Sequence, residues 1–135
     1  MWRCYWLARL AAGYLETGDL GRAELALKRG LSHVASGDGG WCEGELLRTQ
    51  IRLQIARSAP AGEVSTAFED AITRTRNQPN RIFELPLVKD LAEFHRGTPA
   101  ANRATDELKR TVGLVTGAPR AVVYSTACEV LKGAN

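Results

Sequence analysis

The sequence has few of the residues that form disulfide frameworks or metal centres. Its three cysteines, Cys4, Cys42 and Cys128, are odd in number and far apart in sequence, and they form no C-x-x-C pair. Neither of the two histidines, His33 and His95, lies at zinc-finger spacing from a cysteine. We therefore expect three reduced thiols, no metal site and no cofactor, as in a cytoplasmic protein.

Long apolar runs are also missing. No stretch approaches the roughly 18 consecutive apolar residues that a membrane-spanning helix requires. The first residues are rich in aromatic side chains, but Arg9 interrupts any apolar core of a signal peptide. We therefore expect no signal peptide and no interaction with a membrane.

Neither sign of charge dominates the sequence. Eighteen basic and fifteen acidic residues give a net charge of +3, and they are scattered along the chain. This distribution argues against binding of nucleic acid, which requires a concentrated basic patch. With only five prolines and no low-complexity tract, the 135 residues are expected to fold as one domain.

A helical hairpin is the clearest pattern that the sequence contains, and it lies between Leu7 and Leu31. Gly18 suits the left-handed position that ends a helix, and Asp19 suits the cap that begins the next one. Apolar residues recur at steps of three and four on both sides of this turn. Before the turn they are Leu7, Leu10, Ala11 and Tyr14; after it they are Leu20, Ala23, Leu27, Leu31 and Val34.

The second helix of this hairpin recurs twice along the chain. A step of four residues and then three appears in Ala23–Leu27–Gly30, in Val64–Phe68–Ala71 and in Ala104–Leu108–Thr111. The three copies begin 41 and then 40 residues apart, which indicates internal repetition. A hairpin of this kind buries its apolar face only against neighbouring hairpins.

The pattern predicts an all-α fold with about seven helices. The hairpins look like tetratricopeptide repeats, and they would stack into a right-handed solenoid that forms a single domain over residues 1–135. Thr98 and Pro99 suit the start of the sixth helix, because a hydroxyl cap precedes a proline in the first turn. The predicted elements are hairpins at about 2–36, 41–76 and 80–115 and a C-terminal helix at about 120–132.

Three short motifs resemble a known family. Trp41, Glu43, Glu45, Leu46 and Arg48 form a Trp-x-Glu-x-Glu-Leu-x-Arg motif; Glu84-Leu85 and Leu91-Ala92 form the other two. They resemble the C-terminal repeat region of large bacterial signalling proteins, in which an adenylate/guanylate cyclase or DNA-binding domain and a predicted ATPase precede tetratricopeptide-like helices.

Two departures from the family pattern are Ile51, where a glycine is expected, and Pro86, where a helix-favouring residue is expected. The sequence has no Walker motif and no cyclase metal carboxylates. The resemblance therefore implies a regulatory or scaffolding repeat domain of a bacterial signalling system and not the enzyme to which such domains are attached.

A groove for a protein or peptide partner is the first hypothesis for function. The first helices of the three hairpins would line it, and Arg48 and Arg52, one turn apart, would grip a carboxylate. The alternative is that these charges only solvate an outer face. The predicted groove residues are Tyr5, Glu45, Arg48, Arg52, Lys89 and Glu93.

Two other hypotheses compete with the groove. An enzyme would use His33, His95 or Cys128, but no local motif brings together a nucleophile, a base and an orienting group, so no catalytic activity is expected. A fragment of a larger regulator would instead associate with itself as a homodimer. For Trp2 and Trp6 the alternatives are burial against the second helix and contact with another copy or a preceding repeat.

Overall fold

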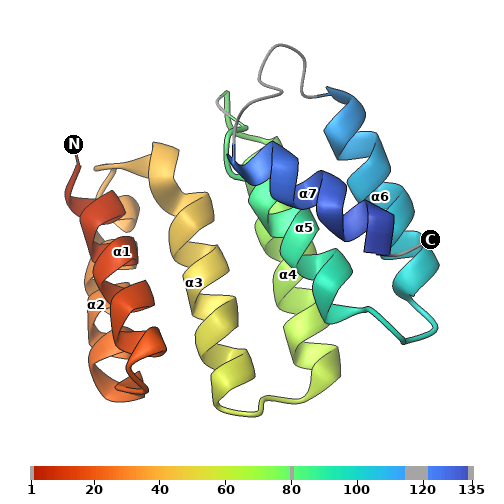
Figure 1. Cartoon of the computed structure of the whole chain (residues 1–135). Coiled ribbons are helices and arrows are strands. Elements are labelled where there is room, and N and C mark those ends of the chain that lie inside the picture. Colours follow the sequence, from red (N-terminus) through yellow and green to blue (C-terminus); the bar gives the residue numbers. More distant parts are fainter. Residues whose placement is uncertain (1, 80, 115–121, 134–135) are drawn as a thin grey trace. The chain divides into compact units, whose positions relative to one another are not determined.

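The structure, a computed structural model, describes residues 2–79, 81–114 and 122–133. These residues form helices and connecting turns and no strand, which confirms the predicted all-α class (Figure 1). The elements in this part of the chain are α1 (Arg3–Glu16), α2 (Leu20–Ala35), the 3-10 turn η1 (Gly40–Cys42), α3 (Glu43–Ala56), α4 (Ala61–Arg76), α5 (Glu84–Phe94), α6 (Ala101–Leu114) and α7 (Val122–Gly133).

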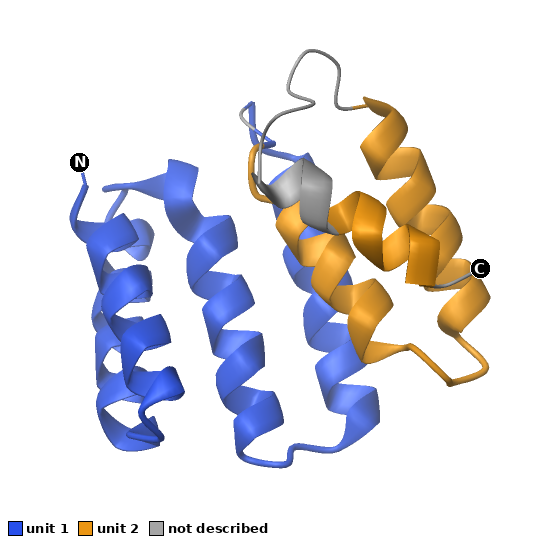
Figure 2. Ribbon diagram, viewed as in Figure 1, with its two compact units in different colours: residues 1–81 blue, residues 82–135 orange. Residues whose placement is uncertain are grey.

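The helices divide into two compact units (Figure 2). Unit 1 covers Met1–Arg81, and unit 2 covers Ile82–Asn135. In unit 1, α1 pairs with α2 and α3 pairs with α4, while α3 also packs against both α1 and α2. In unit 2, α5, α6 and α7 pack against one another. The helices α1 and α2 lie within the range 2–36, α3 and α4 within 41–76, and α5 and α6 within 80–115.

The turns that close the first two hairpins share one backbone conformation. Gly18 follows α1 with φ +80°, and Ser58 follows α3 with φ +56°. Both backbone N–H groups bond back to the carbonyl three residues earlier, at 3.1 and 2.9 Å. As predicted, Asp19 caps α2, because its carboxylate accepts a hydrogen bond from the backbone N–H of Arg22 at 3.1 Å. The two turns lie 40 residues apart in sequence and define the register between the hairpins.

The second helices of the three hairpins bury the predicted repeat positions. Phe68 and Leu108 are 1% and 0% exposed, and none of the nine residues in the three copies reaches the surface. The copies are Ala23–Leu27–Gly30 in α2, Val64–Phe68–Ala71 in α4 and Ala104–Leu108–Thr111 in α6. The repetition seen in the sequence is therefore a repetition of core positions.

The inner face of α1 differs from the predicted one. Leu10 is 48% exposed and Leu7 is half-buried, whereas Cys4, Ala8 and Ala11 are fully buried. Small side chains at these positions let α1 approach α2 closely, which a leucine would prevent. Leu10 and Trp6 therefore lie on the outer side of α1.

The sixth helix begins later than its sequence indicates. The Thr98 hydroxyl does not cap α6; it donates a hydrogen bond to the His95 carbonyl at 2.7 Å and so closes the end of α5. The helix then starts at Ala101, two residues after Pro99. In α5, Pro86 occupies the first turn, where a missing N–H has no consequence.

The last helix packs against both α6 and α5. It begins at Val122, and the first two residues of the predicted range, 120 and 121, lie outside the described residues. Residues 80 and 115, at the ends of the third predicted hairpin, also lie outside them. No helix in the described ranges is both long enough and apolar enough to cross a bilayer.

Candidate functional site

Two of the predicted groove residues are bound to each other. The Arg48 guanidinium lies 3.5 Å from the Glu45 carboxylate, and Glu45 is only 7% exposed. Arg52, one turn further along α3, is half-buried and makes no ion pair with any described residue. Arg48 would have to exchange one carboxylate for another to grip a partner, whereas Arg52 would not.

The aromatic residues of α1 gather against the 3-10 turn. The Tyr5 ring stacks on Trp41 with centroids 6.0 Å apart, and Trp2 meets Trp41 edge-on at 5.3 Å. Trp6 contacts only the edge of Tyr5 among these rings and is 65% exposed. Trp2 and Tyr5 therefore pack against η1, and much of Trp2 and Trp6 faces outward.

Lys89 and Glu93 belong to unit 2 and lie on α5. The Lys89 ammonium is 3.1 Å from Asp90 and 3.8 Å from Glu93, and the Lys89 side chain is largely covered. The structure thus brings Tyr5, Glu45 and Arg48 into one unit and this ion-pair cluster into the other. A groove across the first helices of all three hairpins stays a prediction.

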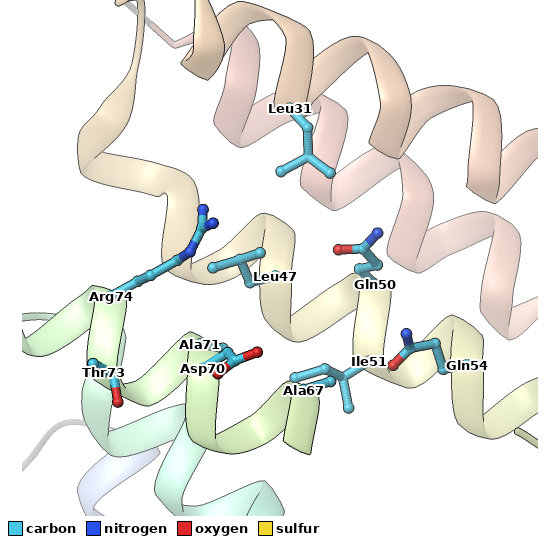
Figure 3. Close-up of a pocket in the computed structure, with 10 residues that line it drawn as sticks. All are labelled: Leu31, Leu47, Gln50, Ile51, Gln54, Ala67, Asp70, Ala71, Thr73 and Arg74. Atoms are coloured by element: carbon cyan, nitrogen blue, oxygen red, sulfur yellow. The ribbon is translucent and has the colours of Figure 1, made fainter. Parts of the chain in front are cut away.

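A hollow opens on a different face of unit 1, over α3 and between α2 and α4. Its volume is about 630 Å³. Figure 3 shows α2 contributing one wall, α4 the other wall and α3 the floor. The residues that line it are Leu31 from α2; Leu47, Gln50, Ile51 and Gln54 from α3; and Ala67, Asp70, Ala71, Thr73 and Arg74 from α4.

Two side-chain amides in this hollow have no hydrogen bond. Gln50 and Gln54 lie on α3 one turn apart, and neither amide bonds to a described residue. The side-chain oxygen of Gln54 is itself buried from solvent and unpartnered. A buried polar atom without a partner costs about 1–3 kcal/mol, so a ligand that supplied a donor there would recover that free energy.

The two ends of the hollow differ in charge. A smaller hollow of about 220 Å³ shares Leu31, Gln50 and Gln54 with the first and extends it. At this end Glu24 accepts from Arg57 at 2.9 Å and lies 3.4 Å from Lys28. The hydrogen bond from Arg57 and then that from Lys28 lower the pKa of Glu24. Two cations against one carboxylate leave this end with a net charge of +1.

The opposite end carries excess negative charge. Arg74 of α4 bonds to Glu43 of α3 at 2.8 Å, and the side-chain amide of Gln78 donates to the same carboxylate at 3.1 Å. Asp70 lines the hollow one turn before Arg74 and makes no ion pair among the described residues. One cation thus faces two carboxylates, which gives a net charge of −1.

Sequence reasoning missed this hollow. It gave neither Gln50 nor Gln54 a role. An uncharged glutamine pair at a spacing of four, flanked by Leu47 and Ile51, is the signal that the sequence does contain. The glutamine pair indicates a binding site only when α2 and α4 are known to border the same face of α3.

The cysteines and histidines form no metal-binding group in the part of the chain that is described. Within it, no three His, Cys, Asp or Glu side chains lie close enough to hold a metal ion. Cys4 and Cys42, far apart in sequence, are both buried beside Gly39, and their thiols are free. Burial and then the nearby Cys4 raise the pKa of the Cys42 thiol to about 12, which leaves it protonated and unreactive. His95 is half-buried at the end of α5.

Several of the motif residues that carry the family resemblance make contacts inside the two units. Glu43 joins the start of α3 to the end of α4, and Leu46 is fully buried against Gly30 of α2. Leu85 and Leu91 are buried in α5. Comparison of the chain with protein-family models, with curated proteins and with solved structures finds no match. The resemblance to the repeat region of bacterial signalling proteins therefore stays a hypothesis.

Proposed function

We propose that this protein is a non-enzymatic interaction module that binds an extended segment of a partner protein in the hollow over α3. The buried, unpartnered side-chain oxygen of Gln54, with the amide of Gln50 one turn away in the same hollow, is the observation that carries the proposal. A glutamine side chain offers an acceptor and two donors, so it bonds to a peptide group through both its N–H and its carbonyl.

The spacing of the two glutamines matches an extended chain. Residues four apart on a helix are separated by about 6.0 Å along the axis, at 1.5 Å per residue. Peptide groups that point the same way in an extended chain recur every second residue, or about 6.6 Å. Gln50 and Gln54 therefore suit two alternate peptide groups of one segment that lies along α3.

The rest of the hollow defines the side chains of that segment. Leu31, Leu47 and Ile51 supply apolar surface, which favours aliphatic residues on the side of the segment that faces the floor. Lys28 and Arg57 at the basic end favour an acidic residue, and Asp70 at the other end favours a basic one. The ligand class is thus an extended apolar peptide with opposite charges at its two ends.

The repeat register and the motif resemblance support the broader role. We propose that the helices belong to a tetratricopeptide-like solenoid, that the module acts in the cytoplasm, and that it serves as a regulatory scaffold of a bacterial signalling system. The face that we assign to the ligand differs from the sequence-based groove, because Arg48 is already paired with Glu45 and the unpartnered oxygen of Gln54 lies in the hollow.

Selection from a random peptide library, followed by titration of the selected peptides, tests this proposal. Replacing both glutamines by methionine keeps their shape and removes the amides. If each amide contributes about 1 kcal/mol, the affinity should fall roughly thirtyfold. Arg52→Glu is the matched control on the same helix, and it should leave the affinity unchanged.

Two results would contradict the proposal. The library could yield no peptide that binds, or the selected peptides could bind the methionine variant as tightly as the original protein. If Arg52→Glu alone abolished binding, the groove predicted from the sequence would be the correct one, and the hollow over α3 would have no part in it.

A further inference from the structure

The outer face of α1 carries an exposed apolar ridge formed by Trp2, Trp6 and Leu10. These side chains are 59%, 65% and 48% exposed. They follow one another at steps of four, so they lie along one side of the helix. Exposed patches of large apolar residues mark sites of contact with other molecules.

The register between the hairpins identifies the residues of α3 that correspond to the ridge residues of α1. The turns at Gly18 and Ser58 set an offset of 40 residues, which pairs Trp6 with Leu46 and Gly13 with Leu53. Leu46 is 0% exposed and Leu53 is 5% exposed. On this face of η1 and α3 the equivalents of Trp2 and Trp6, Cys42 and Leu46, are thus buried, and only the equivalent of Leu10, Gln50, is half-buried. On α1 all three ridge residues are exposed.

An α-helix of the preceding hairpin is what buries the face on α3. A Cβ atom added to Gly30 of α2 would lie 2.5 Å from the Leu46 side chain, so Leu46 sits directly on the α2 backbone. Leu53 lines a hollow together with Leu27 of α2. By analogy with α2 on α3, the ridge on α1 suits a helix that places a small residue opposite Trp6.

Two arginines define the charge of that helix. At 100° per residue, Arg3 lies on one side of the ridge and Arg9 on the other. Both are exposed, and neither makes an ion pair with a described residue. Carboxylates on both flanks of the partner helix would meet these cations. Two copies of α1 paired antiparallel across a two-fold axis at Trp6 would instead place Arg3 beside Arg3 of the second copy on one flank and Arg9 beside Arg9 on the other. Both flanks would then carry only positive charge, which is unfavourable.

We infer that the ridge binds an acidic amphipathic α-helix of a partner protein, with a glycine or alanine stripe seated on Trp2 and Trp6 and glutamates or aspartates beside Arg3 and Arg9. This contact is separate from the hollow over α3, since it uses the opposite helix of the first hairpin and recognises a helix in place of an extended chain.

Two synthetic helical peptides test this inference. One carries an alanine stripe flanked by glutamates, and the other carries the same stripe flanked by lysines. Titration of each into the full chain should show binding of the first alone, with a shift of the tryptophan emission to shorter wavelength. Raising the salt concentration from 0.05 to 0.5 M should weaken the binding several-fold, because exposed ion pairs are screened.

Variants of the chain locate the contact. Trp6→Ala should weaken binding at least about tenfold, as for a tryptophan at the centre of an interface. Leu25→Ala is the control, since it removes another exposed apolar residue from the same hairpin. The double variant Arg3→Glu and Arg9→Glu should reverse the preference and bind the lysine peptide. Arg3 and Arg9 are exposed, so these substitutions should leave the core of unit 1 unchanged. A reversed preference between the two peptides would then come from charge alone.

Three outcomes overturn the inference. One is the absence of binding to either peptide. Another is a dimer in sedimentation that Trp6→Ala dissociates, which would make a second copy the occupant. The third is binding to vesicles of phosphatidylcholine and phosphatidylserine that depends on Trp6 and Arg9 while the peptides fail to bind, which would make the ridge a membrane contact.

Discussion

The contact between Gly30 and Leu46 joins the first two hairpins, and it predicts an unusual response to a small substitution. Alanine normally stabilises a helix by about 0.5–1 kcal/mol when it replaces an interior glycine. At Gly30 the new Cβ atom would lie 2.5 Å from one methyl of Leu46 and 3.2 Å from the other. Because Leu46 is fully buried, it cannot move aside freely.

The expected magnitude follows from two opposing terms. Forcing an extra carbon into a packed core costs about 1–3 kcal/mol, and the gain in helix propensity offsets up to about 1 kcal/mol of that cost. Gly13→Ala is the matched control, because this residue is also inside a helix and an added Cβ would meet nothing within 4 Å. Gly13→Ala should therefore stabilise the protein, and the difference between the two variants measures the steric cost alone.

Urea denaturation followed by circular dichroism provides the assay. With a slope of about 2 kcal/mol per M, a difference of about 2 kcal/mol separates the two midpoints by about 1 M. Adding Leu46→Val to Gly30→Ala should recover part of the loss, because the shorter side chain leaves room for the new carbon. If Gly30→Ala stabilised the protein as much as Gly13→Ala does, the close packing of α2 on α3 described above would be wrong.

Three further predictions concern single side chains. Ser58 has φ +56°, a left-handed conformation that glycine adopts without strain, so Ser58→Gly should raise the free energy of unfolding by up to about 1 kcal/mol. Ser36 has φ −81°, so Ser36→Gly should lower that free energy. Asp19→Ala should cost about 0.5–2 kcal/mol in the same denaturation assay, through loss of the α2 cap. At pH 8, iodoacetamide should modify Cys128 well before Cys42, whose pKa is about 12, and urea should abolish the difference. The pKa of the Cys42 thiol is higher in the folded than in the unfolded state, so this thiol stabilises the fold fully below the unfolded pKa of about 8.5 and loses that effect as the pH rises toward 12. The urea midpoint should therefore fall between these pH values. It should fall less in Cys42→Ala.

Local rules predicted most of the helical framework. Gly18 and Asp19 act as a helix stop and a helix start because the geometry of a helix end depends only on neighbouring residues. The repeated step that contains Phe68 and Leu108 is buried because residues three and four apart lie on the same face of a helix, and that face packs against the neighbouring helix. The same rules failed at Thr98, where one hydroxyl could serve either of two helix ends and bonds to the end of α5.

Tertiary contacts decided what local rules could not. Hydrophobicity favoured Leu10 as a core residue, but the close approach of α1 to α2 admits only small side chains, and Leu10 is outside. Gln50 and Gln54 are ordinary helix residues in the sequence, and their importance depends on the unoccupied space between α2 and α4. Sequence patterns therefore predicted the fold class of the chain but could not predict the candidate site.

All three tryptophans of the chain, Trp2, Trp6 and Trp41, lie in unit 1, and unit 2 has none. Tryptophan emission during denaturation therefore reports on residues 1–81 only, whereas circular dichroism records the helices of both units. If the two signals change at the same urea concentration, the units unfold as one cooperative body. If they change at different concentrations, the chain contains two folding units that lose their structure independently, and the stability of each is measured separately in one titration.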